Sequence, residues 1–418
     1  MPHFLPLLPR HLLTLGMIVA LALCAAPLQA QSDAAPEGPP RIALLATYYQ
    51  KNSHADAIGT KFIEGFPLMD GSVRQPRVEI VSMWIDQTTD DDLGHQKAAQ
   101  HDIPIHDTIR EALTLGGDDL AVDGVLFIGE HGDYPRNRFG SKMYPRLRIL
   151  DQVFTVFDEV GRSVPVFNDK MLSHNWFDAK WVIDRAADLD VPLMAGSVLP
   201  VSPRVPEMEH EKGVKIAEAV AVGYGSIDAY GFHVLEMLQC MVERRAGGET
   251  GVASVRCVQG EEVYELAERG VFSMELVEAA CEGAERRRGR TMRENEPNPT
   301  AMIIDYRDGT RAAALIATRH VGEFWGYAAR LDDGRIVRTE FRLDEDSGLF
   351  PHFSYQCLNL ERMFLTGEPV IPAERTLVTS GILDAALRSL KNDGETYPTP
   401  HMMDLTYQPP ADEVIRPR

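Results

Sequence analysis

Short apolar runs and amphipathic stretches alternate along the first half of the chain. The runs have the length of strands buried on both faces, and the stretches between them repeat apolar residues at helical spacing. This alternation predicts an α/β fold, a Rossmann-like doubly wound parallel sheet with helices between the strands. Strands are predicted at residues 41–46, 78–83, 124–129, 165–168 and 192–195, and helices at residues 54–66, 91–100, 107–114, 147–160 and 175–188.

The pattern changes after about Tyr224, where longer runs alternate apolar and polar residues. A helix predicted at 229–243 leads into these runs, and the tetrapeptides "RDGT" and "DDGR" within them are typical of hairpin turns. This favours a C-terminal α+β domain on an open, largely antiparallel sheet, with a closing helix at 377–391. The predicted organisation is a signal peptide (1–30), a linker (31–40), a Rossmann-like domain (41–200), an α+β substrate domain (201–395) and a tail that packs back on the body (396–418).

The first thirty residues have the layout of a cleaved Sec-type signal. A single Arg10 precedes an apolar run at 12–26, and the small-residue exit "APLQAQ" follows, with cleavage expected near Ala30. The run is shorter than the ~20 residues that a membrane span needs. We therefore expect a periplasmic or secreted protein without a membrane anchor, delivered without any cofactor acquired in the cytoplasm.

Composition narrows the range of partners. The 418 residues carry a net charge of −20, which argues against binding to nucleic acid or to anionic membranes. After cleavage of the signal the chain keeps Cys240, Cys257, Cys281 and Cys357, which form no CxxC pair. No metal cluster is predicted from them, and both disulfides and buried free thiols remain open.

Several segments together resemble the glucose-fructose oxidoreductase/inositol dehydrogenase/MocA (Gfo/Idh/MocA) family. They are "VDGVLFIG", "VPVFNDKMLSHNWFDAKWVIDRAADLDVPLMAG", "GSIDAYGFHVLEMLQCMVE" and "GEPVIPAERTLVTSGILDAALRSL". The resemblance spans roughly residues 41–407. It implies an oxidoreductase that uses a nicotinamide cofactor on a sugar or sugar derivative, and a homo-oligomer formed through the C-terminal sheet.

Three departures from the family pattern bear on function, and the first of them concerns the cofactor. The glycine-rich turn is replaced by "ATYYQKNSH", the proline after the motif lysine is Met171, and Asp228 lies five residues before the motif histidine instead of four. Tyr48 and Tyr49 would occupy the space where glycines let the backbone approach a pyrophosphate. Asp86 could still hold a ribose. We therefore predict a degenerate nicotinamide site, with NAD(P) use open and Tyr48 and Asp86 as candidate cofactor contacts.

Two residues carry the chemistry that the resemblance implies. Lys170 follows a parallel strand and would polarise or protonate a sugar hydroxyl, while His233 would act as a general acid/base, with Glu236 on the same helical face. The structural alternatives are a surface lysine paired with Asp169 and a histidine satisfied within the core.

The loop "GEHGDYPRNRFGSKMYPR" concentrates polar residues at the end of another strand. It could bind a polyhydroxylated substrate, or it could be an ion-paired loop that bridges domains. No fixed ligand spacing supports a metal in this region. The predicted substrate-binding residues are Glu130, His131, Tyr134, Arg136, Asn137 and Asp228.

Two classes of function remain open. The first is an exported enzyme that acts on a carbohydrate, either as a nicotinamide oxidoreductase or as a cofactor-free lyase, isomerase or hydrolase. The second is a non-catalytic protein, either a periplasmic sugar-binding protein or a scaffold. The hairpin-rich second half argues against a binding protein with two parallel lobes, and the lost glycines favour the cofactor-free branch.

Overall fold

The computed structural model describes residues 38–344, 347–410 and 414–417, so the predicted signal peptide lies outside the described residues. Its first sheet contains five strands, all paired in parallel, in the order β4-β1-β5-β6-β7. All five strands predicted for this half are confirmed. Their apolar residues are buried in the sheet, as the sequence pattern predicts. They are β1 (Arg41–Tyr48), β4 (Glu79–Gln87), β5 (Gly124–Ile128), β6 (Val166–Asp169) and β7 (Leu193–Gly196).

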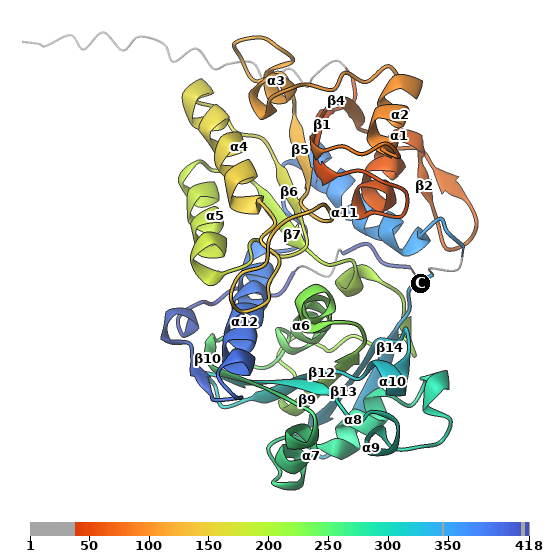
Figure 1. Cartoon of the computed structure of the whole chain (residues 1–418), viewed down its shortest axis with the longest axis vertical. Helices are drawn as coiled ribbons and strands as arrows, with labels where there is room; N and C mark the ends of the chain where they lie inside the picture. The colour runs from red at the N-terminus through yellow and green to blue at the C-terminus, as the bar shows by residue number, and fades with distance from the viewer. Residues whose placement is uncertain (1–37, 345–346, 411–413, 418) are drawn as a thin grey trace, which may run out of the picture. The chain divides into compact units, whose positions relative to one another are not determined.

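Alternate residues of β1 enter two different cores, which explains why this strand is apolar throughout. Ala43 and Leu45 pack in the cluster that contains α4 and α5, whereas Ile42, Leu44 and Ala46 pack in the cluster that contains the first helix. Helices therefore cover both faces of the sheet, as Figure 1 shows. They are η1 (Ala55–Thr60, a π-helix), α1 (Lys61–Glu64), α2 (Leu93–Gln100), α3 (Ile109–Thr114), α4 (Arg146–Val160) and α5 (Trp176–Asp188).

The second sheet has eight strands in the order β15-β10-β11-β12-β9-β13-β14-β8. Its pairings are antiparallel except that β12 runs parallel to β9, and both predicted hairpins are present. The predicted α+β half is thus confirmed. The strands are β8 (Arg204–Val205), β9 (Ile216–Gly223), β10 (Val252–Gln259), β11 (Thr300–Tyr306), β12 (Arg311–Ile316), β13 (Gly326–Leu331), β14 (Ile336–Phe341) and β15 (Tyr397–Pro398).

Helices α6 and α12 lie on the face of this sheet that is turned towards the first sheet, and smaller helices lie on its other face (Figure 1). Helix α11, although it comes late in the chain, returns to the first sheet, where Leu360, Met363 and Phe364 pack in the core of β1. The bounds are α6 (Ile227–Val242), α7 (Glu261–Glu268), α8 (Met274–Ala280), α9 (Met292–Asn295), α10 (Thr318–Val321), α11 (Pro351–Thr366) and α12 (Ala373–Lys391).

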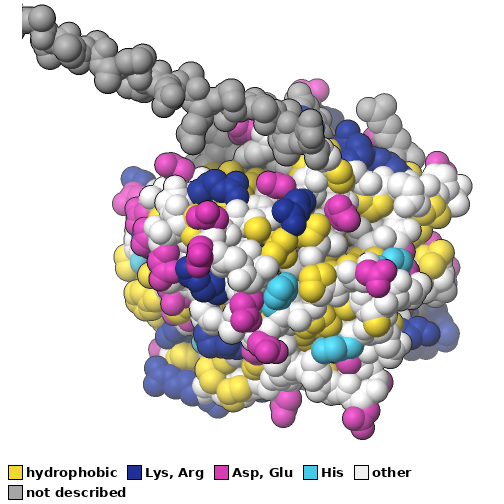
Figure 2. Space-filling model, turned by 90° about the horizontal axis from the view of Figure 1, so that it is seen from above, with side chains coloured by type: hydrophobic (Ala, Val, Ile, Leu, Met, Phe, Trp, Pro, Cys, Tyr) yellow, Lys and Arg dark blue, Asp and Glu magenta, His cyan; other side chains and the backbone are white. Residues whose placement is uncertain are grey.

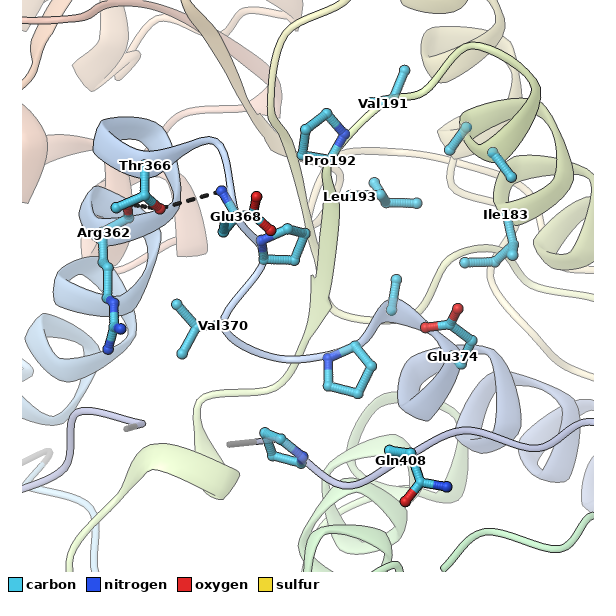
Figure 3. Close-up of a pocket in the computed structure, with 16 residues that line it drawn as sticks. Ile183, Val191, Pro192, Leu193, Arg362, Thr366, Glu368, Val370, Glu374 and Gln408 are labelled. Carbon is cyan, nitrogen blue, oxygen red and sulfur yellow. Dashed lines mark hydrogen bonds between the residues drawn. The ribbon is translucent and has the colours of Figure 1, made fainter. Parts of the chain in front are cut away.

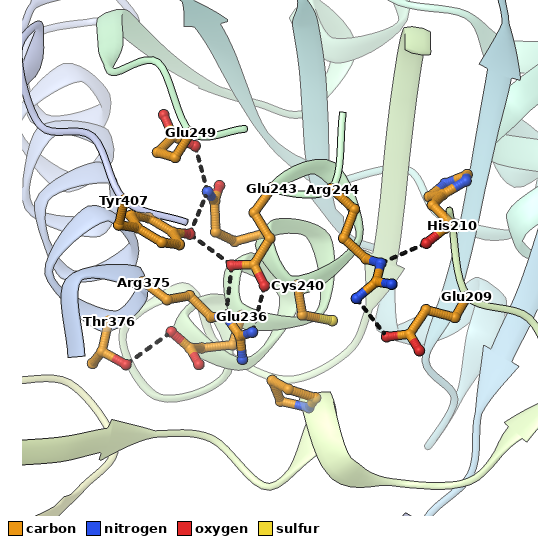
Figure 4. Close-up of polar contacts among 12 residues, drawn as sticks. Glu209, His210, Glu236, Cys240, Glu243, Arg244, Glu249, Arg375, Thr376 and Tyr407 are labelled. Atoms are coloured by element: carbon orange, nitrogen blue, oxygen red, sulfur yellow. Dashed lines mark hydrogen bonds and ion pairs between the residues drawn. The ribbon is translucent and has the colours of Figure 1, made fainter. Parts of the chain in front are cut away.

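A buried polar network holds α6 in place (Figure 4). Glu243, just after α6, accepts hydrogen bonds from Arg375 of α12 (Nε to Oε2, 2.8 Å) and from the Tyr407 hydroxyl (2.7 Å). Gln239 donates to the same hydroxyl at 2.9 Å. Because these groups are buried and mutually paired, they fix α6, the helix that carries His233, against α12 and the tail.

Two further observations bear on the chemistry of the chain. Cys240, Cys257, Cys281 and Cys357 are all buried free thiols. Within the described ranges, no helix is both long enough and apolar enough to cross a membrane.

Candidate active site

A cavity of about 260 Å³ lies at the carboxyl ends of the parallel strands, the place where open α/β sheets bind ligands. The loops after β1, β5, β6 and β7 contribute residues to it, and so do α6, α11 and the segments next to β9, β13 and β14. Lys170 and His233 both line this cavity, together with Glu130 and His131, although they come from different halves of the chain. The fold therefore brings these four predicted site residues together.

Four residues that line the cavity have left-handed backbones although none is glycine: Phe350 (φ +48°), just before α11, and three residues that follow strands of the first sheet. Asn52 has φ +63°, His131 has φ +68° and Lys170 has φ +63°. Such conformations cost of order 1–3 kcal/mol each and persist where the surrounding structure enforces them, most often at functional sites. Asn52, His131 and Lys170 each lie just beyond a strand end, so the strain presents the side chain to the cavity.

Lys170 belongs to a buried chain of charges. Its Nζ lies 3.2 Å from Glu130 Oε1, and Arg146 Nη2 donates to Glu130 Oε2 at 2.8 Å. Burial would raise the pKa of Glu130, but Lys170 and Arg146 outweigh it and hold that pKa well below its usual range. Glu130 is therefore a carboxylate, and it pairs with Lys170 in place of the Asp169 partner that the structural alternative required.

Asp169 pairs instead with His54, a residue that the sequence did not identify as catalytic. Its Oδ2 lies 2.8 Å from His54 Nδ1, and the carboxylate is only 1% exposed while the imidazole is 16% exposed. A carboxylate on Nδ1 selects the tautomer in which Nδ1 carries the proton, so Nε2 is the nitrogen available to a ligand. The arrangement is that of an oriented general base.

His233 and His131 are neutral imidazoles around the same cavity. Burial, followed by the charge of Lys170, lowers the pKa of His233 well below its ordinary value, and burial lowers the pKa of His131 to about 4. His233 Nδ1 lies 2.6 Å from the Ser197 hydroxyl, and the His131 ring lies 5.7 Å from the His54 ring. These two histidines are suited to hydrogen bonding with substrate hydroxyls.

Glu236, predicted as catalytic, lies beside the cavity rather than in it. Its carboxylate accepts from Thr379 Oγ1 at 2.6 Å and from the Ser197 amide at 3.4 Å, and burial raises its pKa. It is buried under Gly196, where an added Cβ would lie 2.7 Å from its Oε2. Glu236 thus accepts a hydrogen bond from the backbone of Ser197, and the hydroxyl of Ser197 in turn contacts His233.

The remaining predicted residues form ion pairs and turns outside the cavity lining. Arg136 pairs with Asp228, which also accepts from the Lys142 amide at 3.2 Å. Asn137 caps its own turn by accepting from the amides of Phe139 and Ser141. This part of the loop bridges to α6, as the structural alternative had it.

The turn after β1, where the family pattern has glycines, carries a tyrosine that is packed into the core. The Tyr49 ring is fully buried against Gly59 and Gly94, and its hydroxyl lies 2.8 Å from that of Thr60. An added Cβ at Gly94 would lie 3.0 Å from the Tyr49 ring, so Gly94 leaves room for this ring.

Other side chains contact Asp86, the residue predicted to hold a ribose, and Tyr48. Both oxygens of Asp86 accept from Arg148 (2.8 and 2.9 Å), and Oδ2 also accepts from the Tyr134 hydroxyl at 2.7 Å. Tyr48 donates to Gln50 at 2.7 Å, and Gln50 in turn donates to Asp91. Tyr48 and Asp86, the candidate cofactor contacts, are therefore engaged by protein partners.

Other parts of the surface are less suited to chemistry. A cavity of about 580 Å³ lies at the amino end of β7, where Val191 and Pro192 face Val370 across mainly aliphatic and proline side chains (Figure 3). Figure 2 shows acidic and basic side chains interspersed over the face seen from above. Among the residues that the structure describes, no group of three or more His, Cys, Asp or Glu side chains could hold a metal ion.

Comparison with known proteins gives the fold. No family model and no curated protein matches the sequence. GenD2 from gentamicin A biosynthesis, solved in complex with NAD, is 13% identical to this chain with a TM-score of 0.53. The match covers 86% of this chain and 96% of the GenD2 chain. A probable dehydrogenase from Thermotoga maritima is 13% identical (TM-score 0.53; 87% and 99% covered), and myo-inositol 2-dehydrogenase from Lactobacillus plantarum is 10% identical (TM-score 0.51; 86% and 99%). The chain therefore shares the two-domain fold of these dehydrogenases over nearly their whole length.

Proposed function

We propose that the chain is an exported, divergent member of the Gfo/Idh/MocA family that performs acid–base chemistry on a small carbohydrate derivative without a nicotinamide cofactor. The observation that carries this proposal is the pairing of His54 with Asp169 and of Lys170 with Glu130 around one cavity. The fold shared with dehydrogenases and the sequence motifs support the family. The signal-like segment at 1–30 supports export.

The geometry suits proton transfer next to a carbonyl group. His54 Nε2 takes a proton from the carbon beside the carbonyl, the C–H bonding pair moves into the new C=C bond, and the carbonyl oxygen becomes an oxyanion. Asp169 stabilises the imidazolium that forms, and the Lys170 ammonium stabilises the oxyanion. If the hydroxyl on the deprotonated carbon passes its proton to the oxyanion and the abstracted proton returns to the former carbonyl carbon, the carbonyl moves by one carbon and the reaction is an isomerisation. If the enolate instead re-forms the carbonyl and expels a leaving group from the next carbon, the reaction is that of a lyase. Neither outcome transfers a hydride.

Nicotinamide use is the alternative that the family implies. The contacts of Tyr48, Tyr49 and Asp86 with other side chains argue against it. Calorimetry of the mature protein with NAD and with NADP should show no binding below the millimolar range. Micromolar binding would restore the dehydrogenase interpretation, because the turn after β1 would then have to open to admit the pyrophosphate.

The acid–base role is tested by solvent exchange. In D₂O the wild-type protein should incorporate deuterium next to the carbonyl of one or more members of a panel of keto sugars, followed by NMR. His54→Gln and Lys170→Met should each lower this rate by ~10²–10⁴. A matched control is His95→Gln, because His95 makes the same 2.8 Å contact with an aspartate, Asp92, on the surface of α2. Full exchange in His54→Gln would refute the role of His54.

A further inference from the structure

The cavity has two chemically different walls. The polar wall carries the deeply buried residues Lys170 (6% exposed), Glu130 (5%) and His233 (8%). Aromatic and aliphatic side chains form the apolar wall, which accounts for ten of the 17 residues that line the cavity and adjoins His233, whose ring lies 6.1 Å from that of Tyr230 and 6.0 Å from that of Trp325. A ligand with hydroxyl groups on every side would place some of them against this apolar wall, where they would lack partners.

The aromatic wall is built around Trp325. The Tyr230 ring is stacked on the Trp325 ring at 6.1 Å between centroids and 14° between planes, and Tyr224 packs against Trp325 at 4.8 Å. Trp325 is 3% exposed and Tyr224 8% exposed, whereas Tyr230 is 37% exposed. The wall therefore runs from the buried interior to solvent, with Tyr230 at the outer end.

The glycines on either side of Tyr224 make room for these rings. A Cβ added to Gly223 would lie 2.7 Å from two atoms of the Trp325 ring, and a Cβ added to Gly225 would overlap the Tyr230 ring. Gly225 also has φ +87°, a conformation that favours glycine. The sequence "GYG" at 223–225 thus holds two aromatic rings flat against the backbone, and the wall is a specific feature of the fold.

The volume limits what can reach the polar wall. At about 260 Å³ the cavity is smaller than the ~300–1,000 Å³ of sites that enclose drug-sized ligands. One sugar ring placed against Lys170 and His54 leaves little further enclosed space. A substituent on that ring can extend along the aromatic wall towards Tyr230, which is 37% exposed.

We infer that the substrate is a single sugar ring that carries a planar aromatic substituent, with the ring on the polar wall and the substituent stacked on Tyr230, the exposed ring that Trp325 supports from behind. This inference rests on the proposed function for the position of the sugar ring. Stacking against the exposed face of an aromatic side chain typically contributes ~1–3 kcal/mol, which corresponds to about 5–150-fold in affinity.

The experiment compares 4-nitrophenyl glycosides with methyl glycosides of the same sugars by calorimetry. For the preferred sugar, the 4-nitrophenyl glycoside should bind at least tenfold more tightly than the methyl glycoside. Tyr230→Ala should remove this preference, so that the two glycosides bind with similar affinity. Gly225→Ala should weaken the preference in the same way, because the added methyl group displaces the Tyr230 ring while every aromatic side chain is retained.

Controls separate this inference from the proposed function. Phe177→Ala, which removes an aromatic side chain that is 76% exposed on α5, should keep the wild-type preference. Equal affinity for the two glycosides would overturn the inference, and so would free 4-nitrophenol binding as tightly as its glycoside. The proposed function fails by a different result, namely undiminished solvent exchange in His54→Gln, so the two failures are distinguishable.

Discussion

At the scale of single residues, the partners of a side chain decide its role in the candidate site. His54 and His233 line the same cavity, yet one has a carboxylate partner and the other a hydroxyl partner. A carboxylate stabilises the imidazolium that forms when the ring accepts a proton, whereas a neutral hydroxyl does so much less. This difference is the reason for assigning the proton-accepting role to His54.

Asp169→Asn tests that assignment. The amide has the shape of the carboxylate but no charge, and its nitrogen competes as a donor on the side facing His54 Nδ1, which favours the wrong tautomer. We expect a fall in kcat of ~10²-fold or more with little change in KM, since Asp169 does not line the cavity. Steady-state kinetics check this, with Asp184→Asn on the exposed face of α5 as the control. A change confined to KM would contradict the role.

Sequence reasoning identified part of the site for reasons that these residues make clear. Lys170 and His233 lie in recognisable segments, and Glu130 and His131 end an apolar strand. The pair His54–Asp169 was missed because 115 positions separate its members, and no local pattern reports such a contact. Spacing on a helix placed Glu236 on the face of His233, but spacing carries no information on depth, and Glu236 is buried one turn further along the helix.

At the scale of elements, the segment after β1 differs from the single helix that its sequence pattern predicts. The sequence predicts one helix at 54–66, whereas the structure has a π-helix, η1, followed by one turn of α-helix. π-Helical turns are found frequently at functional sites. Here η1 begins directly after His54, and its Ala57 lines the cavity.

The variant Tyr49→Ala tests whether the Tyr49 ring prevents NAD from binding at the turn after β1. Removing a fully buried ring should lower the free energy of unfolding by ~3–5 kcal/mol, measured by urea denaturation. NAD binding should not appear, because Asp86 stays engaged by Arg148 and Gln50 by Asp91. If calorimetry on this variant gave micromolar NAD binding, Tyr49 alone would be the block and the side chains that engage Asp86 and Gln50 would be incidental. Tyr355→Ala, a partly exposed tyrosine on α11, serves as the control for loss of a ring.

At the scale of the whole molecule, one continuous hydrophobic cluster contains residues of both sheets, including Leu45 and Phe127 of the first and Val220 and Ile303 of the second. The strand and helix pattern predicted both sheets well because each element buries a regular apolar stripe. It could not predict that α11 returns to the first sheet, since an amphipathic helix packs on any apolar face of suitable shape. Glu361 adds specificity there by accepting from the Arg77 amide at 2.6 Å.

The buried histidines make the stability of this assembly depend on pH. Burial, followed by the charges of Arg204 and Arg244, lowers the pKa of His210 from 6.5 to about 4, and burial together with Lys61 does the same for His352. The unfolded chain therefore binds more protons than the folded chain between about pH 4 and pH 6.5. Stability is fully present above that window and falls as the pH drops through it, by up to about 3 kcal/mol for each histidine.

His210→Gln isolates one of these contributions away from the cavity. Glutamine can keep a hydrogen bond with the Tyr327 hydroxyl, which lies 2.9 Å from His210 Nε2, but it does not titrate. Between pH 7 and pH 5 the wild-type free energy of unfolding should fall by about 2 kcal/mol more than that of the variant. His210 is protonated only in the unfolded chain over the roughly 1.5 pH units between its unfolded pKa and pH 5, and each unit is worth about 1.4 kcal/mol. Urea denaturation at the two pH values measures both, and His95→Gln, which changes an exposed histidine, should behave as the wild type. An equal fall in His210→Gln and the wild type would mean that His210 is already protonated in the folded protein, and the charges of Arg204 and Arg244 would then have to be compensated by Glu209, the carboxylate beside them.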